Sequence, residues 1–261
     1  MKSIVCVKVT PKVEQIKFDE ARKTVTREGV ENEINDADKN ALEMALQLKE
    51  RHGGTVVVLS MGPPSFESHL KLAIAMGADD AILLSDRSFG GADTYATSRV
   101  LAAAIKRMAP YDVVLCGEAS ADGSTEQTPP SIAEWLQVPG IMYANSIELQ
   151  GNRVLAKKSI AGGYETVEAE TPLLASVELG CNSPRFPDFR RKRWAEKEFK
   201  LTVWNMQDLG FSPTEVGLGG SLTEVKELRN MSSRKRRGEL IGGDSKEVAA
   251  RLGQIIRSVG G

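Results

Sequence analysis

Histidine and cysteine are scarce in this chain of 261 residues, which contains two histidines and three cysteines. Cys6, Cys116 and Cys181 lie far apart, and the histidines form no cluster with them. We therefore predict no metal site, because zinc and related sites need several such ligands at short spacing. Two of the cysteines fall in apparent strands, so we expect buried free thiols in a reducing, cytoplasmic environment.

An excess of charge is also missing, since 34 basic residues offset 35 acidic ones and the formal net charge is -1. This balance gives no indication of nucleic-acid binding. The basic run at residues 234–237 has no aromatic residues beside it, so we interpret it as part of a solvated linker or arm. No apolar run is long enough for a membrane span, and no signal-peptide pattern precedes the first strand.

The chain instead alternates β-branched strands with amphipathic helices. Strands are predicted at residues 3–9, 55–60, 80–84 and 112–116. Helices are predicted to begin at Asn35, after Gly62-Pro63-Pro64 and at Asp93. This alternation is typical of right-handed βαβ units, so we predict an α/β fold with a doubly wound parallel sheet.

The second half of the chain has a different pattern. Short strands are predicted at residues 142–149, 153–160, 164–169 and 173–178, with Gly162-Gly163 as a hairpin turn. They predict an antiparallel edge of the sheet at residues 141–180. Residues 12–34 indicate a hairpin or a long excursion.

Residues 205–261 are predicted to form a C-terminal arm that follows one α/β domain at residues 1–204. The arm ends in an amphipathic helix at residues 244–258, with Val248, Leu252, Ile255 and Ile256 in its apolar stripe. Because such an arm has too little core of its own, we expect it to pack on a partner subunit.

The stretch around which the chain is organised runs from Cys116 to Pro130. A strand leads into a loop of glycine, alanine and hydroxyl residues, and the loop leads into a helix. Thr128 is predicted to be the N-cap, and Ser131 with Glu134 have the spacing of a capping box. The free N–H groups and partial positive charge of a first helical turn make a seat for a phosphate. The alternative is an ordinary capped strand-to-helix turn.

Ligands of parallel sheets bind outside the carboxyl ends of the strands, at the topological switch point. Three segments are predicted to meet there: the region after Val9, the turn at Met61-Gly-Pro63, and the loop at residues 117–128. No Gly-x-Gly-x-x-Gly motif follows the first strand, which disfavours an ordinary NAD-type Rossmann site.

Taken in order, these segments resemble the β subunit of electron-transfer flavoprotein, the EtfB/FixA family, over nearly the whole chain. The motifs that carry the resemblance are Val5-Cys-Val-Lys8, Asn35 with Ala41-Leu-Glu43, Ser60-Met-Gly-Pro63, Ala73-Ile-Ala-Met-Gly-Ala-Asp79, Gly91-Ala-Asp-Thr94, Asp122-Gly-Ser-Thr-Glu-Gln127, Lys158 with Glu165-Thr-Val-Glu-Ala-Glu-Thr-Pro-Leu-Leu-Ala175, and Asn182-Ser-Pro-Arg185. The chain departs from the family pattern at Ala161, Ser183, Asp36-Ala37, the basic stretch at residues 189–193 and Pro129-Pro130. The resemblance implies a Rossmann-like domain of the adenine-nucleotide-binding type.

The resemblance also implies which residues form the nucleotide site. They are Cys6, Asn35, Asp36, Ala37, Asp38, Met61, Gly117, Glu118, Ala119, Ser120, Ala121, Asp122, Gly123, Ser124, Thr125, Glu126, Gln127 and Thr128. Asp122, Gln127 and Thr128 are expected to face ribose and phosphate, and the N–H groups of Ser124 to Thr128 are expected to receive phosphate oxygens.

In such proteins the β subunit pairs with an α subunit that carries FAD. The β site holds a structural AMP in one branch of the family and a second FAD in the flavin-bifurcating branch. There the flavin accepts a hydride from NADH and divides the electrons between ferredoxin or flavodoxin and the α-subunit FAD. Bifurcating members resemble Asp-Gly-Asp-Thr-Ala-Gln in this loop, so Asp122-Gly-Ser-Thr-Glu-Gln127 favours FAD, with AMP as the alternative.

Residues 182–194 match the family's recognition loop, which docks on acyl-CoA dehydrogenases in the AMP branch. Phe189 falls at the position of the apolar anchor, and Arg190, Arg191 and Arg193 suggest a more acidic partner surface. From the residues alone, this stretch is either a solvated basic surface or a docking surface.

No residue of the chain has the pattern of a catalytic nucleophile or general base, because Ser120 and Ser124 have no histidine nearby in the pattern. We therefore predict no catalytic residue. A stress-type adenine-nucleotide-binding protein is a remote alternative, which the hairpin, the Asn-x-Pro-Arg element and the arm disfavour.

Overall fold

The computed structural model describes residues 1–12, 17–19, 24–26, 31–224, 238 and 240–259. The chain divides into two units, Met1–Lys226 and Glu227–Gly261, which we describe separately. The compact part of the first unit extends beyond residue 204, where the sequence places the domain boundary.

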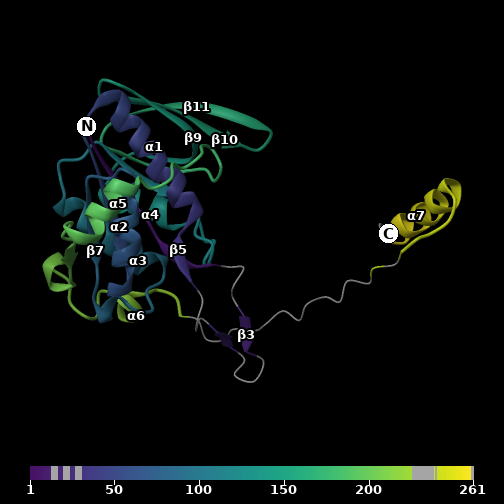
Figure 1. The fold of residues 1–261 in the computed structure, drawn as a ribbon, viewed down its shortest axis with the longest axis horizontal. Helices are drawn as coiled ribbons and strands as arrows, with labels where there is room; N and C mark the ends of the chain where they lie inside the picture. Colours follow the sequence, from purple (N-terminus) through teal and green to yellow (C-terminus); the bar gives the residue numbers. More distant parts are fainter. Residues whose placement is uncertain (13–16, 20–23, 27–30, 225–237, 239, 260–261) are drawn as a thin grey trace. The chain divides into compact units, whose positions relative to one another are not determined.

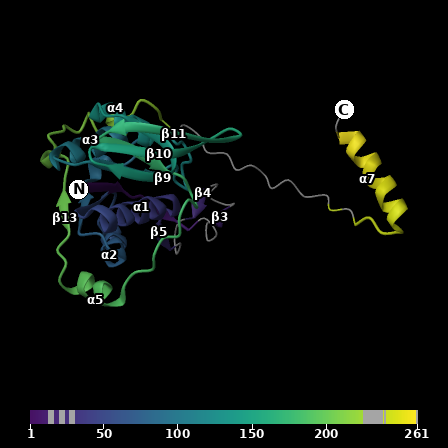
Figure 2. The ribbon, with the colours of Figure 1, turned by 90° about the horizontal axis from the view of Figure 1, so that it is seen from above.

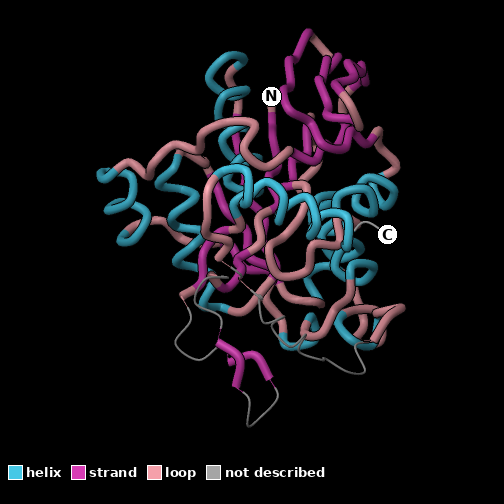
Figure 3. The backbone as a smooth tube through the Cα atoms, turned by 90° about the vertical axis from the view of Figure 1, so that its right-hand side faces the viewer, coloured by secondary structure: helices cyan, strands magenta, loops and turns pink. Residues whose placement is uncertain are grey.

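A nine-stranded sheet forms the centre of the first unit, with strand order β11-β10-β9-β12-β8-β1-β6-β7-β13. From β9 to β13, neighbouring strands pair in parallel, whereas β10 pairs antiparallel with β9 and β11. Figure 3 shows helices packed around part of this sheet and a group of strands that extends past them. The strands are β1 Lys2–Cys6, β6 Thr55–Met61, β7 Asp80–Leu84, β8 Val113–Gly117, β9 Gly140–Gln150, β10 Arg153–Ile160, β11 Gly163–Glu170, β12 Leu173–Val177 and β13 Thr202–Trp204.

The helices connect the strands in a doubly wound order, which confirms the predicted fold class. They are α1 Asp36–His52, α2 Glu67–Met76, α3 Thr94–Arg107 and α4 Thr128–Leu136, with short 3-10 turns η2 Pro64–Phe66 and η3 Arg87–Phe89. The chain runs outward from β1 through β6 to β7, and α3 then carries it back to β8 on the other side of β1. The switch point therefore lies between β1 and β8.

Each face of the sheet has its own apolar core. Alternate strand residues such as Val5 and Val58 pack with α1 and α2 on one face, whereas Ile4 and Leu59 pack with α3 and α4 on the other. Figure 2 shows the two helix pairs on opposite sides of the strands. The strands are apolar on both faces, which is expected of a parallel sheet covered by helices.

Strand β12 corrects the predicted antiparallel edge. It lies between β8 and β9 and is parallel to both, so only β10 and β11 form the antiparallel extension, which Figure 1 shows beside α1. All five residues of β12 are buried. A short strand that is buried on both faces is typical of a parallel sheet, and this signal was available in Leu173-Leu-Ala-Ser-Val177.

The region before α1 contains two antiparallel strand pairs. Strand β2 Val9–Pro11 pairs with β5 Asn32–Ile34, and β3 Lys17–Asp19 pairs with β4 Thr24–Thr26. Residues 13–16, 20–23 and 27–30 of the predicted excursion lie outside the described residues.

Helix α5, Phe189–Lys197, occupies the end of a segment that the sequence indicates to be a loop. Asp188 starts this helix by accepting a hydrogen bond from the Arg191 N–H. After β13 come the 3-10 turn η4 Gln207–Leu209 and the short helix α6 Gly217–Gly220. Asp93 holds the residues just after α6 against the domain, because its Oδ2 accepts hydrogen bonds from the N–H groups of Leu222 and Thr223.

The second unit contains helix α7, Ser245–Val259, close to the predicted span. Asp244 caps it by accepting hydrogen bonds from Lys246 and Glu247. Leu252 and Ile256 of its predicted apolar stripe are exposed, and packing on a partner remains a prediction. The basic run at residues 234–237 lies outside the described residues. In the described part of the chain, no helix has the length and apolar character needed to cross a membrane.

Candidate functional site

The carboxyl ends of β1 and β8 lie side by side at the switch point. Cys6 is directly opposite Cys116 in this parallel pair, and both thiols are buried. A hydrogen bond with Cys6 and burial raise the pKa of the Cys116 thiol. Cys116 therefore stays protonated, and the two cysteines belong to the apolar core at the carboxyl ends of the two strands.

The carboxyl group of Asp38 ties the two strand ends together. Its Oδ2 accepts a hydrogen bond from the Lys8 N–H at 2.7 Å, and its Oδ1 accepts from the Gly117 N–H at 2.9 Å. A Cβ atom at Gly117 would lie 2.4 Å from Asp38 Oδ1 and 2.8 Å from the Ala37 Cβ, so this position has no room for a side chain. Burial raises the pKa of Asp38 to about 7, although the two N–H donors act against this shift.

The side chain of Asn35 holds the first half of the loop. Its Nδ2 donates to the Ala119 carbonyl at 2.8 Å, and its Oδ1 accepts from the Ala121 N–H at 3.1 Å. Asn35 is buried, as is Asp38. The polar atoms of both residues are thus used by the protein itself. They shape the loop from the start of α1, and a contact of this segment with a nucleotide stays a prediction.

Lys8 is a site residue that the sequence reasoning missed. Its Nζ lies 2.6 Å from Asp122 Oδ1 and 3.2 Å from Ser120 Oγ, so its ammonium group projects into the loop. Burial raises the pKa of Asp122, but the hydrogen bond and charge of Lys8 outweigh it and lower the pKa overall. The available signal was a lysine two residues beyond the end of the central strand.

The second half of the loop has an unusual backbone. Ser124 and Glu126 have φ values of 44° and 58°, in the left-handed region that side chains with a Cβ disfavour. The Ser124 N–H donates to the Ser120 carbonyl at 2.9 Å, so it is not free for a phosphate as predicted. Residues 121–127 are exposed.

The start of α4 also differs from the prediction. Thr128 is the first helical residue, Gln127 takes the N-cap position, and no side chain caps the helix. Gln127 is instead held through its Oε1, which accepts from Thr94 Oγ1 at 3.2 Å. Because Pro129 and Pro130 have no N–H, donors at this helix start must come from residues 125–128.

Two other predicted site residues lie farther from the loop. Asp36 is exposed and pairs with Lys39 at 2.8 Å. Met61 ends β6, which β1 separates from β8 in the sheet. Ala37 is buried next to Gly117.

Among the described residues, no group of three or more histidine, cysteine or acidic side chains is placed to hold a metal ion.

The predicted docking residues Phe189, Arg190, Arg191 and Arg193 all lie on α5. We call Phe189, Arg190 and Arg193, together with Phe186 before the helix, the docking surface. Phe186 is 94% exposed and Phe189 is 79% exposed. Arg191 points away from this surface and donates hydrogen bonds to the carbonyls of Ile74 and Ala78 at the end of α2. It therefore fixes α5 in place, and Phe186 is an exposed aromatic residue that the sequence reasoning did not select as an anchor.

The Asn-x-Pro-Arg element anchors this surface to α1. Arg185 forms a two-pronged pair with Glu43, with Nε–Oε2 at 2.8 Å and Nη2–Oε1 at 2.9 Å, and it also contacts Glu50. Asn182 donates to the Asn40 carbonyl at 3.0 Å. The motif is thus a structural anchor.

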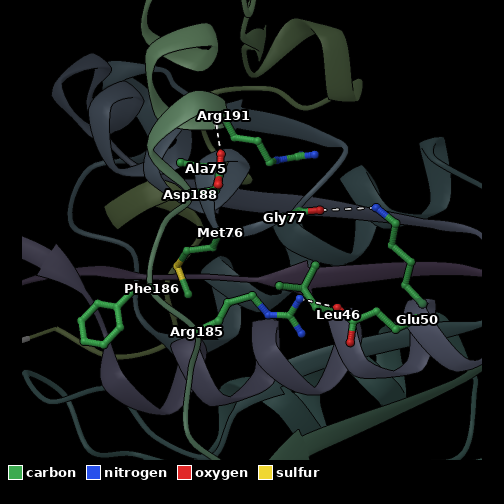
Figure 4. Close-up of a pocket in the computed structure, with 10 residues that line it drawn as sticks. Leu46, Glu50, Ala75, Met76, Gly77, Arg185, Phe186, Asp188 and Arg191 are labelled. Atoms are coloured by element: carbon green, nitrogen blue, oxygen red, sulfur yellow. Dashed lines mark hydrogen bonds and ion pairs between the residues drawn. The ribbon is translucent and has the colours of Figure 1, made fainter.

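A pocket of about 390 Å³ lies beside the anchor, between Phe186, Arg185 and the carboxyl-terminal ends of α1 and α2 (Figure 4). These helices connect parallel strands of the central sheet, α1 before β6 and α2 before β7, so they run antiparallel to those strands. Their carboxyl-terminal ends therefore lie at the amino edge of the sheet, opposite the loop at residues 117–128. The pocket and the docking surface belong to a second region of the molecule.

Replacing Asp38 by asparagine is expected to change the pH dependence of stability. The folded protein keeps a proton on Asp38 between pH 3.8, the ordinary pKa, and about 7. Its free energy of unfolding therefore falls as pH rises through this window, by at most about 1.4 kcal/mol per pH unit from this group. Urea unfolding should show the wild type losing stability relative to Asp38→Asn up to about pH 7. Asp36→Asn is the exposed control, and a pH-independent difference between wild type and Asp38→Asn would contradict this account.

Replacing Arg185 by alanine is expected to release the segment before α5. The substitution leaves the buried Glu43 carboxylate without its partner, which costs about 2 kcal/mol. Thermal unfolding should therefore show a lower midpoint, and the amides of residues 182–188 should exchange faster with solvent. Arg190→Ala, on the exposed side of the same region, should leave both measurements unchanged. Equal effects of the two substitutions would contradict the anchoring role.

The electron transfer flavoprotein domain family matches residues 23–205 of the chain. An electron transfer flavoprotein subunit beta from Clostridium acetobutylicum is 42% identical over 251 residues, 96% of this chain and 95% of that protein. Another from Thermoanaerobacterium thermosaccharolyticum is 39% identical over 258 residues, 99% of this chain and 98% of that protein. The caffeyl-CoA reductase-Etf complex subunit CarD of Acetobacterium woodii is 40% identical over 255 residues, covering 97% and 96%.

These similarities extend along nearly the whole chain and include both the loop at the switch point and the docking surface. They agree with the motifs that the sequence contains and with the doubly wound sheet of the structure. The chain belongs to the electron transfer flavoprotein family, within the group of its β subunits.

Proposed function

We propose that this chain is the β subunit of a heterodimeric, flavin-bifurcating electron-transfer flavoprotein and binds a second FAD at its switch point. One observation carries the proposal. The loop at residues 117–128 leads directly into α4 and is fixed by hydrogen bonds with Asn35, Asp38 and Lys8, which all lie at the ends of neighbouring elements. Open-sheet proteins bind nucleotides at this place.

The residues present fit the phosphates of a nucleotide. The Lys8 ammonium supplies a cation, and the loop N–H groups at residues 125–128 precede the positive end of α4. We call these N–H groups and the Lys8 ammonium the phosphate seat. A Cβ atom at Gly123 would lie 3.4 Å from Ser120 Oγ and 4.0 Å from Lys8 Nζ. Glycine therefore leaves room beside the cation for a ligand to approach the backbone.

The motif in this loop favours FAD over AMP. Asp122-Gly-Ser-Thr-Glu-Gln127 resembles the bifurcating version of the family motif, in which glycine allows a larger ligand with two phosphates to come close to the backbone. One of the relatives is named as a subunit of a caffeyl-CoA reductase-Etf complex, which associates an electron-transfer flavoprotein with a reductase.

A flavin bound here would supply the redox chemistry, which is hydride acceptance from NADH and one-electron transfer. The chain itself supplies positioning. Asn35 and Asp38 fix the loop, Lys8 would offset phosphate charge, and the protonated Cys116 lies with Cys6 in the apolar core at the strand ends. No side chain of the chain is required as a nucleophile or base.

A structural AMP is the second candidate, and Glu126 is the observation that favours it. Glu126 stands where the bifurcating motif has alanine, and the Pro129-Pro130 pair departs from the family pattern. In that case the chain would be a scaffold and docking module.

The partners follow from the same assignment. An FAD-carrying α subunit would receive the C-terminal arm, and a dehydrogenase such as an acyl-CoA dehydrogenase would bind the docking surface. Phe186 and Phe189 would be its apolar anchors, and the basic Arg190 and Arg193 would face acidic side chains. If the second nucleotide is FAD, NADH would be the electron donor and ferredoxin or flavodoxin would be a further acceptor.

The nucleotide content of the complex tests the proposal. The chain is co-expressed with its α subunit, the purified complex is denatured, and the released FAD and AMP are quantified. We expect two FAD and no AMP per heterodimer. One FAD with one AMP would contradict the bifurcating role, and the absence of both from this subunit would contradict the nucleotide site.

Two variants that each remove one lysine charge, one inside the loop region and one outside it, make the same measurement specific for the loop. Lys8→Gln removes the ammonium group of the phosphate seat and is expected to lower the nucleotide content of this subunit. Lys12→Gln is the control, because Lys12 pairs with Glu31 at 2.6 Å outside the loop. Equal nucleotide content in the two variants would exclude Lys8 from the site.

A further inference from the structure

Tyr143 of β9 contacts the loop at residues 117–128 through its hydroxyl group. The Oη atom donates a hydrogen bond to Glu126 Oε2 at 2.7 Å. Tyr143 is 37% exposed and Glu126 is exposed, so the contact does not fill the core. It joins two segments that β12 separates in the sheet order.

The backbone at both ends of this contact is in an unfavourable conformation. Tyr143 has a φ of 60° and Glu126 a φ of 58°. Around Tyr143 the pairing with β12 shifts by one residue, and its N–H donates to Ser176 Oγ at 2.9 Å. A bulge of this kind turns a side chain out of the regular alternation of a strand. Here it aims the tyrosine ring at the loop.

The carboxylate of Glu126 creates an electrostatic problem for an anionic ligand. Its own N–H is part of the phosphate seat, so a carboxylate that turned toward the seat would repel a phosphate. Other negative charge lies close by. Burial raises the pKa of Glu118, and the charges of Glu178 and Glu126 raise it further.

The direction of the Tyr143 contact relieves this repulsion. In the order β9-β12-β8-β1, the tyrosine lies on one side of the loop's parent strand, and Lys8 comes from the other side. The hydrogen bond therefore holds the Glu126 carboxylate on the side away from Lys8. The same bond raises the pKa of Tyr143, which keeps its hydroxyl group a donor.

We propose that Tyr143 is a positioning residue that keeps the Glu126 carboxylate out of the phosphate seat and so lowers the electrostatic cost of nucleotide binding. The inference rests on the proposed nucleotide-binding function of this loop. It concerns the phosphate group, which AMP and FAD share, and it holds for either nucleotide.

A double-mutant cycle tests the inference on the heterodimer, with Tyr143→Phe, Glu126→Gln and the double variant. Nucleotide is removed from each complex, and AMP, FAD and adenosine are titrated back by calorimetry. Adenosine lacks the phosphate and is the control ligand. Tyr143→Phe is expected to weaken AMP binding about five- to tenfold, which is the size of a like-charge contact near water.

The expected coupling has three signatures. The loss of AMP affinity disappears when Tyr143→Phe is made in the Glu126→Gln background, it grows as the salt concentration falls, and it is absent for adenosine. An equal loss in both backgrounds, or an equal loss for adenosine, would overturn the inference and leave the proposed function intact. A wild-type complex that binds neither AMP nor FAD in this subunit would overturn both.

Discussion

The buried carboxyl group of Asp38 is the constraint on which the site depends. It accepts hydrogen bonds from Lys8 and Gly117 and so fixes the spacing between the carboxyl ends of β1 and β8. This contact positions the segment that follows each strand. Lys8 projects toward the loop after β1, and the loop begins at Gly117 at the end of β8. A buried carboxyl group is costly, and its two backbone partners offset part of that cost.

Helix α1 links this site to the docking surface. Its first residues hold the loop through Asn35 and Asp38, and residues farther along it hold Asn182 and Arg185. The loop at residues 117–128 and the proposed docking surface therefore lie at opposite edges of one sheet but are both held by α1. The family motifs near both regions are explained by hydrogen bonds within the protein, since Asn35 and Arg185 are both occupied by it.

Much of the fold could be predicted from the sequence, because long β-branched runs and amphipathic helices are strong local signals. The strands β6, β7 and β8 and the helices α1 and α3 lie close to their predicted positions. The parallel placement of β12 was missed because strand partners are set by tertiary packing. The start of α5 was missed because its basic and aromatic residues resemble a loop, although Asp188 offered a cap.

The position of the loop at the switch point was predictable, but the contacts of its residues were not. Sequence order indicates which loops follow which strands, and this located residues 117–128 at the switch point. It does not show that the side chains of Asn35 and Asp38 form hydrogen bonds with the loop. Nor does it show that Lys8 contacts the loop or that Tyr143 forms a hydrogen bond with Glu126. Such contacts join residues about 20 to more than 100 positions apart, and only the folded chain brings them together.

The most direct measurement is the structure of the heterodimer with its nucleotides bound. The account predicts a phosphate group within hydrogen-bonding distance of Lys8 Nζ and of N–H groups at residues 125–128. It also predicts that Asp38 and Asn35 keep their contacts with Gly117, Lys8 and Ala119. A nucleotide bound elsewhere in this subunit, or one that takes Asn35 or Asp38 as direct ligands, would contradict it.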